Sequence, residues 1–155
     1  MNKGIIETKL EASGLSVRQF VNEAWPFNCG VLTGNLLYIS GHTPTINGVP
    51  QYIGVTGDTV DLETAQKAAL LCLENCMGAI KTVVGDLDRV SKIVKVNGFI
   101  ASAPGFDKQA LVMNPVSEAL VDIFGAKHAR AALGVTMLPG NVPVELEMIV
   151  EVVDI

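Results

Sequence analysis

An arginine and a group of glutamates near the C-terminus are the residues whose types and spacing best suit chemistry. Arg130 begins one apolar segment, and Glu145, Glu147 and Glu151 lie in the next. Side chains alternate between the two faces of a β-strand, so this spacing predicts that the three glutamates share one face. An arginine can bind a carboxylate, and a glutamate can act on a water or a proton. The alternative is a cross-strand ion pair on an exposed face, which contributes only about 0–1 kcal/mol.

The segments that carry these residues are predicted to form a β-hairpin at the end of the chain. Apolar residues alternate over 131–137 and again over 144–152, and Leu-Pro-Gly-Asn at 138–141 separates the two runs. In a symmetric hairpin Arg130 lies opposite Ile149, with two of the glutamates as its diagonal neighbours.

The first part of the chain is predicted to contain a short helix and a hairpin. Residues 2–13 suit an amphipathic helix that stops at Gly14. Residues 27–41 suit two strands that meet at 33–35. The segment that follows is rich in Gly and Pro, and we expect only a short strand there, at 51–55.

The clearest helix runs from an N-cap at Asp61 to a stop at Gly85. Its apolar residues recur at spacings of three and four, which predicts one buried face. The members of that face are Ala65, Ala69, Cys72, Cys76, Ile80 and Val83.

A strand and a second helix follow. The β-branched run over 90–102 predicts a central strand whose alternation slips near Ile93 or Asn97, as a bulge would cause. Asn114-Pro115 resembles an N-cap followed by a proline in the first helical position, with a separate helical turn expected over 107–113. The buried face of this helix is predicted to consist of Val116, Leu120, Ile123 and Phe124, before Gly125.

This order of elements predicts an α+β fold with the two main helices packed on one face of a sheet. Strands with apolar residues on both faces suggest that a second subunit covers the other face, so we expect a homo-oligomer. The length of 155 residues suits a single domain over 1–155, with residues 1–14 as a short helical extension.

Composition and charge exclude several classes of protein. Hydrophobic residues make up 49% of the chain and charged residues 17%, which excludes a disordered protein. The net charge is −5 and basic residues do not cluster, which argues against a nucleic-acid partner. Neither a leader sequence nor an apolar run of membrane-spanning length is visible, so we expect a cytoplasmic protein without a membrane partner.

The cysteines and histidines offer no recognisable motif. Cys29, Cys72 and Cys76 are predicted to be free thiols, and we expect no bound metal. His42 and His128 stand without a paired cysteine or carboxylate motif, and the sequence assigns neither of them a catalytic role.

Several short segments between about residue 26 and the C-terminus form a set that can be compared with known families. They are Pro26-Phe27-Asn28, Gly34-Asn35, Ser40-Gly41-His42-Thr43-Pro44, Gly85-Asp86-Leu87, Asn114, Ala129-Arg130, Leu138-Pro139 and Val144-Glu145-Leu146-Glu147. Together they resemble the RidA/YjgF-like family of reactive intermediate deaminases, also called the L-PSP endoribonuclease family. The most specific part is the final block, in which an arginine, a Leu-Pro pair and a Glu-x-Glu motif match in order and spacing.

The resemblance implies a chorismate-mutase-like sandwich with a mixed sheet, assembled as a homotrimer with clefts between adjacent subunits. It also implies hydrolysis of 2-imino acids or their enamine tautomers to 2-keto acids and ammonia, without a cofactor. The partner is then a small carboxylate-bearing molecule. Two alternatives stay open, namely a trimer that binds a carboxylate metabolite without turning it over and an endoribonuclease, which the acidic charge disfavours.

Roles carry over from the family onto matching positions. The resemblance implies that Arg130 holds the substrate carboxylate and that Glu145 orients the hydrolytic water. Gly41 would allow the backbone to approach a ligand closely. Asn114 matches a family asparagine, although the sequence favours a plain helix cap as its role.

Three positions depart from the family pattern. Phe27 stands where active deaminases carry a tyrosine, and it keeps the ring without the hydroxyl group. Ala132 replaces the family cysteine, which excludes thiol chemistry there but leaves a backbone N–H that can donate. Ser117 stands where a second aromatic residue is usual, which implies a wider or more polar pocket.

Overall fold

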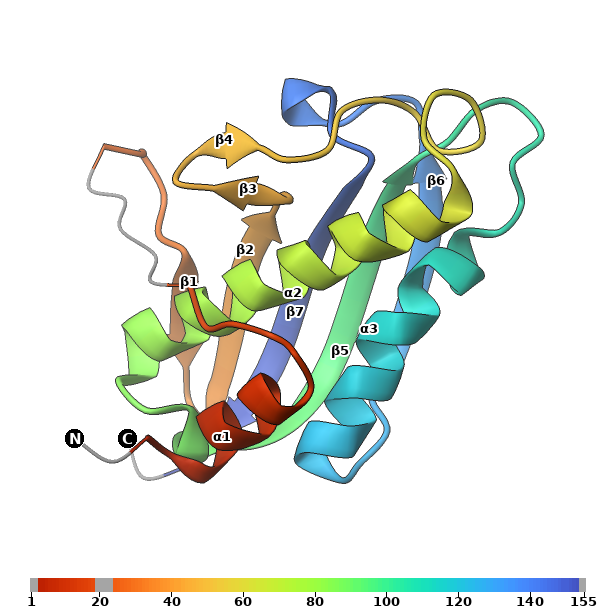
Figure 1. The fold of residues 1–155 in the computed structure, drawn as a ribbon. Coiled ribbons are helices and arrows are strands. Elements are labelled where there is room, and N and C mark those ends of the chain that lie inside the picture. The colour runs from red at the N-terminus through yellow and green to blue at the C-terminus, as the bar shows by residue number, and fades with distance from the viewer. Residues whose placement is uncertain (1–2, 19–23, 154–155) are drawn as a thin grey trace.

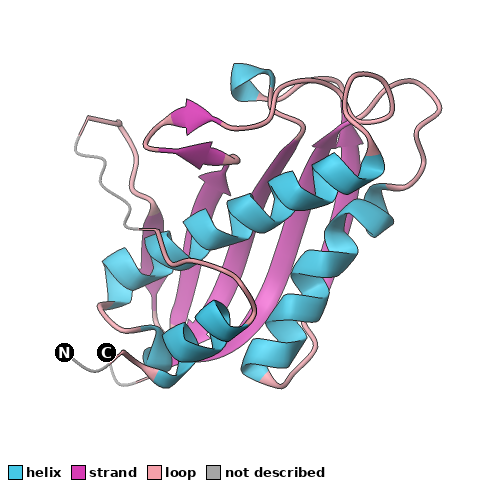
Figure 2. Ribbon diagram, in the orientation of Figure 1, coloured by secondary structure: helices cyan, strands magenta, loops and turns pink. Residues whose placement is uncertain are grey.

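The computed structural model describes residues 3–18 and 24–153, and within them a sheet of five strands is covered on one face by helices (Figures 1 and 2). The fold is therefore α+β, as predicted. The helices are α1 (Ile5–Ala12), α2 (Leu62–Val84) and α3 (Gln109–Phe124), with 3₁₀ turns at Leu87–Arg89 and Pro139–Asn141. The strands are β1 (Gly30–Thr33), β2 (Leu36–His42), β3 (Thr45–Ile46), β4 (Val49–Pro50), β5 (Val90–Ala101), β6 (Ala129–Val135) and β7 (Val144–Val152).

The main sheet is mixed, with the strand order β1-β2-β7-β5-β6. The predicted hairpin of β1 and β2 is confirmed, since Thr33 pairs with Leu36 across a tight turn. Every neighbouring pair is antiparallel except β5 and β6, which run parallel and are joined through α3. This strand–helix–strand unit places β6 at one edge of the sheet and β1 at the other (Figure 1).

The C-terminal hairpin is a wrong prediction, because β5 lies between β6 and β7. Arg130 pairs with Val96 on β5, and Val96 pairs in turn with Met148 on β7, so Arg130 is not opposite Ile149. The turn at 138–141 changes the direction of the chain but carries it across β5. Turn-forming residues therefore marked the reversal without fixing the pairing partner.

The core lies between the sheet and α2. The N-cap of this helix is confirmed, because the Asp61 carboxylate accepts a hydrogen bond from the Thr64 N–H at 2.8 Å. The buried face is also confirmed except at its last member. Val83 is 37% exposed while Val84 is 4% exposed, since the 3.6-residue repeat brings the residue four after Ile80 under the sheet.

The helix α3 begins earlier than predicted. Asn114 lies inside it and is not its cap, and the turn expected over 107–113 is the first part of the same helix. Pro115 has no N–H to donate to the carbonyl of Leu111, and that carbonyl instead accepts from Gln66 Nε2 at 2.8 Å. A side chain of α2 thus replaces the missing backbone bond. The C-terminal stop of α3 at Gly125 is as predicted.

Two further details concern the strands. The predicted bulge in β5 is confirmed, because its register against β7 shifts just after Ile93. The short strand expected over 51–55 is wrong, and the ribbon of β3 and β4 lies just before it. The turn between β3 and β4 is Asn47-Gly48, with both residues at positive φ. Asn-Gly is a two-residue hairpin signal, and this hairpin was not among the predictions.

Candidate functional site

Arg130 lies on the face of the sheet that the helices cover. Its partner Val96 and the next residue across, Met148, are both buried under the helices. Residues that pair across strands share a face, so the Arg130 side chain projects toward α3. The start of β6 at the sheet edge therefore positions the Arg130 cation beneath α3.

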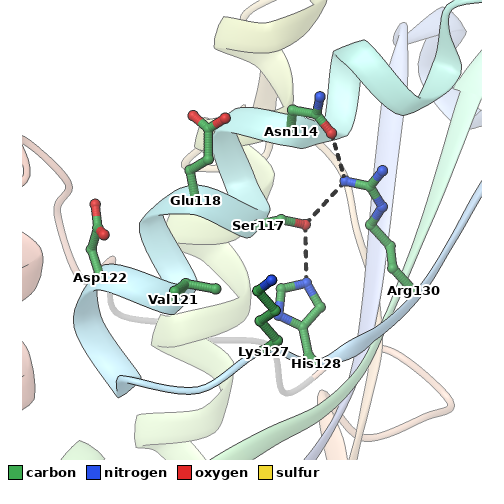
Figure 3. A pocket seen from close by; sticks show the side chains of 8 residues that line it. All are labelled: Asn114, Ser117, Glu118, Val121, Asp122, Lys127, His128 and Arg130. Atoms are coloured by element: carbon green, nitrogen blue, oxygen red, sulfur yellow. Dashed lines mark hydrogen bonds between the residues drawn. The ribbon is translucent and has the colours of Figure 1, made fainter.

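Two side chains of α3 hold the guanidinium in place. Arg130 Nη1 donates to Asn114 Oδ1 at 3.0 Å and to Ser117 Oγ at 3.1 Å. These residues are three apart, which places them on one side of the helix, and Figure 3 shows both facing the arginine. Both hydrogen bonds use the same nitrogen, and in the described part of the chain Nε and Nη2 have no hydrogen-bond partner.

His128 extends this network. Its Nε2 lies 3.0 Å from Ser117 Oγ, so the serine hydroxyl stands between the imidazole and the guanidinium (Figure 3). Partial burial lowers the pKa of His128, and the positive charge of Arg130 lowers it further. The imidazole is therefore held neutral more strongly than an exposed histidine would be.

These groups line a hollow of about 750 Å³ on the surface of the chain. Within residues 3–18 and 24–153, no carboxylate lies within ion-pair distance of Arg130. The lining residues are Asn114, Ser117, Glu118, Val121, Asp122, Lys127, His128 and Arg130 (Figure 3). The arrangement can bind a small anion through a fixed guanidinium.

Glu145 lies on the opposite face of the sheet. Along β7 the even-numbered residues are buried under the helices, whereas the odd-numbered positions are only partly buried and face the other way. Burial raises the pKa of Glu145, and the nearby charge of Glu147 raises it further. Glu147 accepts a hydrogen bond from Asn97 Nδ2 at 2.9 Å, which fixes the second carboxylate. The predicted common face of the glutamates is thus confirmed.

Gly41 leaves the space that the Glu145 carboxylate occupies. A Cβ atom at this position would lie 2.0 Å from Glu145 Oε1, closer than non-bonded atoms can approach. Gly41 stands where the register of β2 against β7 shifts, between Ile39 and His42. A strand irregularity and a glycine together bring the carboxylate against bare backbone.

The chain matches known proteins along most of its length. The family model described as Endoribonuclease L-PSP matches residues 18–152. The chain belongs to this family. It is 31% identical over 151 residues to Protein TCP17 of Trypanosoma cruzi, covering 96% of this chain and 94% of the other.

Two solved structures of related proteins support the assignment. A crystal structure of a protein with unknown function from Agrobacterium tumefaciens is 37% identical, with a TM-score of 0.89 and coverage of 96% of this chain and 94% of the other. The structure of E. coli TdcF with bound serine is 26% identical, with a TM-score of 0.58 and coverage of 98% and 100%. The resemblance to the RidA/YjgF-like, or L-PSP, family is therefore confirmed.

The remaining L-PSP family positions fall in different places. Ala132 pairs with Gly98 on β5 and shares the helix-covered face with Arg130, where it packs against the core. Phe27 precedes β1, the edge strand farthest from β6, and stacks on Trp25 with ring centroids 5.1 Å apart. The chain thus brings Arg130, Asn114 and Ser117 together and keeps Phe27, Gly41 and Glu145 away from them.

Several residues of the pocket were not predicted. Glu118, Val121 and Asp122 follow Asn114 at helical spacings, so they share its side of α3. His128 is two residues before Arg130, a spacing that places both side chains on one side of an extended chain. These spacings could have been recognised in the sequence, but no motif connected His128 with Ser117.

The other candidate groups have structural roles. The thiols of Cys72 and Cys76 are buried and donate to the carbonyls of Val144 and Leu146, at 3.5 Å and 3.8 Å. His42 is buried, which lowers its pKa to about 4. Among the residues that the structure describes, no His, Cys, Asp and Glu group of metal-binding size is found. The same residues contain no helix that could cross a membrane.

Proposed function

We propose that this protein hydrolyses small 2-imino acids, or their enamine tautomers, to 2-keto acids and ammonia in clefts between subunits of a homotrimer. The observation that carries the proposal is the state of Arg130. Its guanidinium is fixed through Nη1 alone, while Nε and Nη2 have no partner among the residues described.

A free Nε–Nη2 edge matches the two oxygens of a carboxylate. Such a bidentate pair is short and directional, and each hydrogen bond to a charged group contributes about 1.5–3 kcal/mol. A 2-imino acid carries its carboxylate on the carbon next to the reacting C=N bond. Holding that carboxylate therefore fixes the position of the electrophilic carbon within one bond length.

Glu145 supplies the acid–base chemistry. Water adds to the carbon of the protonated imine while the Glu145 carboxylate accepts one of the water protons, which gives a neutral tetrahedral amino alcohol. The protonated Glu145 then donates that proton to the nitrogen. As the C–N bond breaks and ammonia leaves, the C=O bond forms and the hydroxyl proton passes back to Glu145, which releases it to solvent. A carboxyl group with a raised pKa suits both steps, because it takes up and releases a proton at a pH closer to neutrality.

The location of Arg130 and Glu145 on opposite faces of one sheet supports a cleft made by two chains. A ligand held by Arg130 of one subunit can meet Glu145 only from another copy whose open sheet face turns toward that pocket. A homotrimer offers three such clefts. E. coli TdcF was crystallised with bound serine, an amino acid with the carboxylate that this reading requires.

Coupling to a dehydratase tests the proposal. Threonine dehydratase releases the enamine, and semicarbazide traps its imine tautomer faster than it traps the keto acid, so early semicarbazone formation measures the imine that survives. We expect the wild-type protein to accelerate imine hydrolysis and so to slow early semicarbazone formation, and Arg130→Ala to lose that effect. Lys127→Ala is the matched control, because it removes a cation from the same pocket and leaves the clamp intact. No acceleration by the wild type beside an active family deaminase would overturn the proposal.

A binding protein without turnover is the second candidate. Phe27 lacks the hydroxyl group of the family tyrosine, and Ala132 lacks the thiol of the family cysteine. The loss of these two polar groups favours ligand binding over catalysis. The Arg130 clamp is complete without Glu145. If the Glu145→Ala variant binds a keto acid as tightly as the wild type and its function is unchanged, the binding protein replaces the deaminase as the proposed function.

The family description raises endoribonuclease activity as a third candidate. The chain carries a net charge of −5, and two carboxylates line the Arg130 pocket beside its cations. Binding to a phosphate backbone needs a basic surface, so these features favour a small substrate. Salt-sensitive RNA binding and cleavage that Arg130→Ala abolishes would reverse this preference.

A further inference from the structure

The Ser117–His128 pair stands directly behind the Arg130 clamp, and the proposed chemistry gives His128 no role. An arginine can only donate hydrogen bonds, so Ser117 Oγ must accept from Arg130 Nη1. The serine proton is then available to His128 Nε2, 3.0 Å away. We assign the neutral imidazole the tautomer with its proton on Nδ1, in which Nε2 accepts this hydrogen bond.

Protonation of His128 changes only the side that faces Ser117. Nδ1 carries a proton in both states, and it has no hydrogen-bond partner among residues 3–18 and 24–153. When Nε2 also carries a proton, it donates to Ser117 Oγ, which then accepts from both cations. The Ser117 hydroxyl proton must then turn away from His128 Nε2, and it becomes free to donate a hydrogen bond into the pocket.

We infer that His128 is a positioning residue of the clamp, which turns the Ser117 hydroxyl toward a bound carboxylate when the imidazole is protonated. The inference rests on the proposed role of Arg130 as a carboxylate clamp. It adds that the site takes up a proton with its anionic ligand, so that carboxylates bind more tightly in mildly acidic solution.

The charges around His128 support this direction. Lys127 from the preceding loop and Glu118 and Asp122 from α3 are the other charged groups that line the hollow. Burial lowers the pKa of His128, and the positive charge of Arg130 from β6 lowers it further. A ligand carboxylate on the guanidinium neutralises the second cause and adds a negative charge nearby. Anion binding and protonation therefore reinforce each other.

Pyruvate binding measured against pH tests the inference. The pyruvate carboxylate stays ionised from pH 5.5 to pH 8, so only the protein titrates. We expect the wild-type Kd to be at least about fivefold lower at pH 5.5 than at pH 8. His128→Gln keeps a hydrogen-bonding group near the position of Nε2 but cannot take up a proton, and its Kd should change by less than about twofold over the same range.

Two variants separate this mechanism from its rivals. Glu145→Gln controls for titration of the other site carboxyl, whose protonation would also favour an anion, and it should retain the wild-type pH dependence. Ser117→Ala should lose most of it, because the imidazolium then acts through its charge alone. The full wild-type pH dependence in Ser117→Ala would overturn the relay through the hydroxyl.

The magnetic resonance signals of the two imidazole rings give an independent measurement of the pKa of His128. The chain has two histidines, and His128→Gln leaves only His42, whose pKa of about 4 keeps it neutral over the range used. Pyruvate should raise the pKa of the His128 signal in the wild type and leave that of His42 unchanged. Binding that depends on Arg130 with the same Kd at pH 5.5 and pH 8 overturns this inference alone. Absence of binding at every pH overturns the clamp and the proposed function as well.

Discussion

The two faces of the sheet carry the two halves of the proposed site, which differ in charge and in support. On the helix-covered face, Arg130 is fixed by two neutral side chains of α3 and has free donors for an anion. On the open face, Glu145 lies against Gly41 and beside a second carboxylate, and burial and like charge raise its pKa. In the proposed function the first half holds negative charge and the second exchanges a proton, and the sheet separates them within a chain.

The largest expected effect tests whether the open-face half performs chemistry. Glu145→Gln keeps the shape of the side chain and removes the base, so we expect the rate of imine hydrolysis to fall about 10²–10⁴-fold. Pyruvate affinity at pH 8 should change little, because Arg130 is intact. Glu151→Gln is the control on the same strand and face, where the wild-type glutamate lies near Lys92 at 3.6 Å. A Glu145→Gln variant with the wild-type rate would remove the proton-transfer half of the comparison.

The next effect tests the helix-covered half. Arg130→Ala removes the charged hydrogen bonds to a carboxylate, and we expect pyruvate to bind about 10–100-fold more weakly. Calorimetric titration beside Lys127→Gln separates the clamp from the general charge of the pocket. Equal losses in the two variants would mean that the ligand senses only charge.

A smaller effect asks whether Gly41 acts through Glu145. Gly41→Ala places a methyl group where the carboxylate oxygen lies, so the side chain must move, and we expect about a tenfold loss of rate. Adding the same change to Glu145→Gln should cost almost nothing further, because the two residues act as a unit. Losses that simply multiply in the double variant would show that Gly41 acts elsewhere.

The smallest effect is a shift along the pH axis. Glu145 must be ionised to accept a proton, so activity falls as the pH drops through its pKa, which is raised above the ordinary value. Glu147→Gln removes one of the two causes of that rise, and the acidic limb of the rate profile should move to lower pH. A limb that stays in place would mean that another group controls it.

Local patterns in the sequence predicted most individual elements. Asp61 and Gly85 mark the ends of α2 because a cap and a left-handed stop depend on neighbouring residues alone. The bulge near Ile93 and the shared face of the glutamates follow from a two-residue repeat. The family resemblance gave a role to Arg130, which the spacing had already singled out, and added Asn114 as a site residue. The fold brings Nη1 of Arg130 to 3.0 Å from Oδ1 of Asn114.

The pairing of the last strands could not be found in the same way. The turn at 138–141 suits a hairpin, yet the strand–helix–strand order of β5, α3 and β6 favours a parallel pair, and the crossover prevails. The start of α3 was misplaced because Pro115 is tolerated inside the helix when Gln66 bonds the exposed carbonyl. Such long-range contacts, like the bond between His128 and Ser117, have no local signature.

Mixing two inactive variants tests most directly whether Arg130 and Glu145 of different chains complete one site. Arg130→Ala and Glu145→Gln are denatured together in equal amounts and refolded, so that subunits assort at random. In a homotrimer with shared clefts, about one quarter of the clefts then combine both wild-type residues. We predict that the mixture of single variants recovers imine hydrolysis to about one quarter of the wild-type activity. A control mixture of the wild type and the double variant has one half of the wild-type activity before refolding, and we predict that refolding lowers it to about one quarter. A mixture of the single variants that stays inactive, beside a control mixture that keeps half of the activity, would contradict the account.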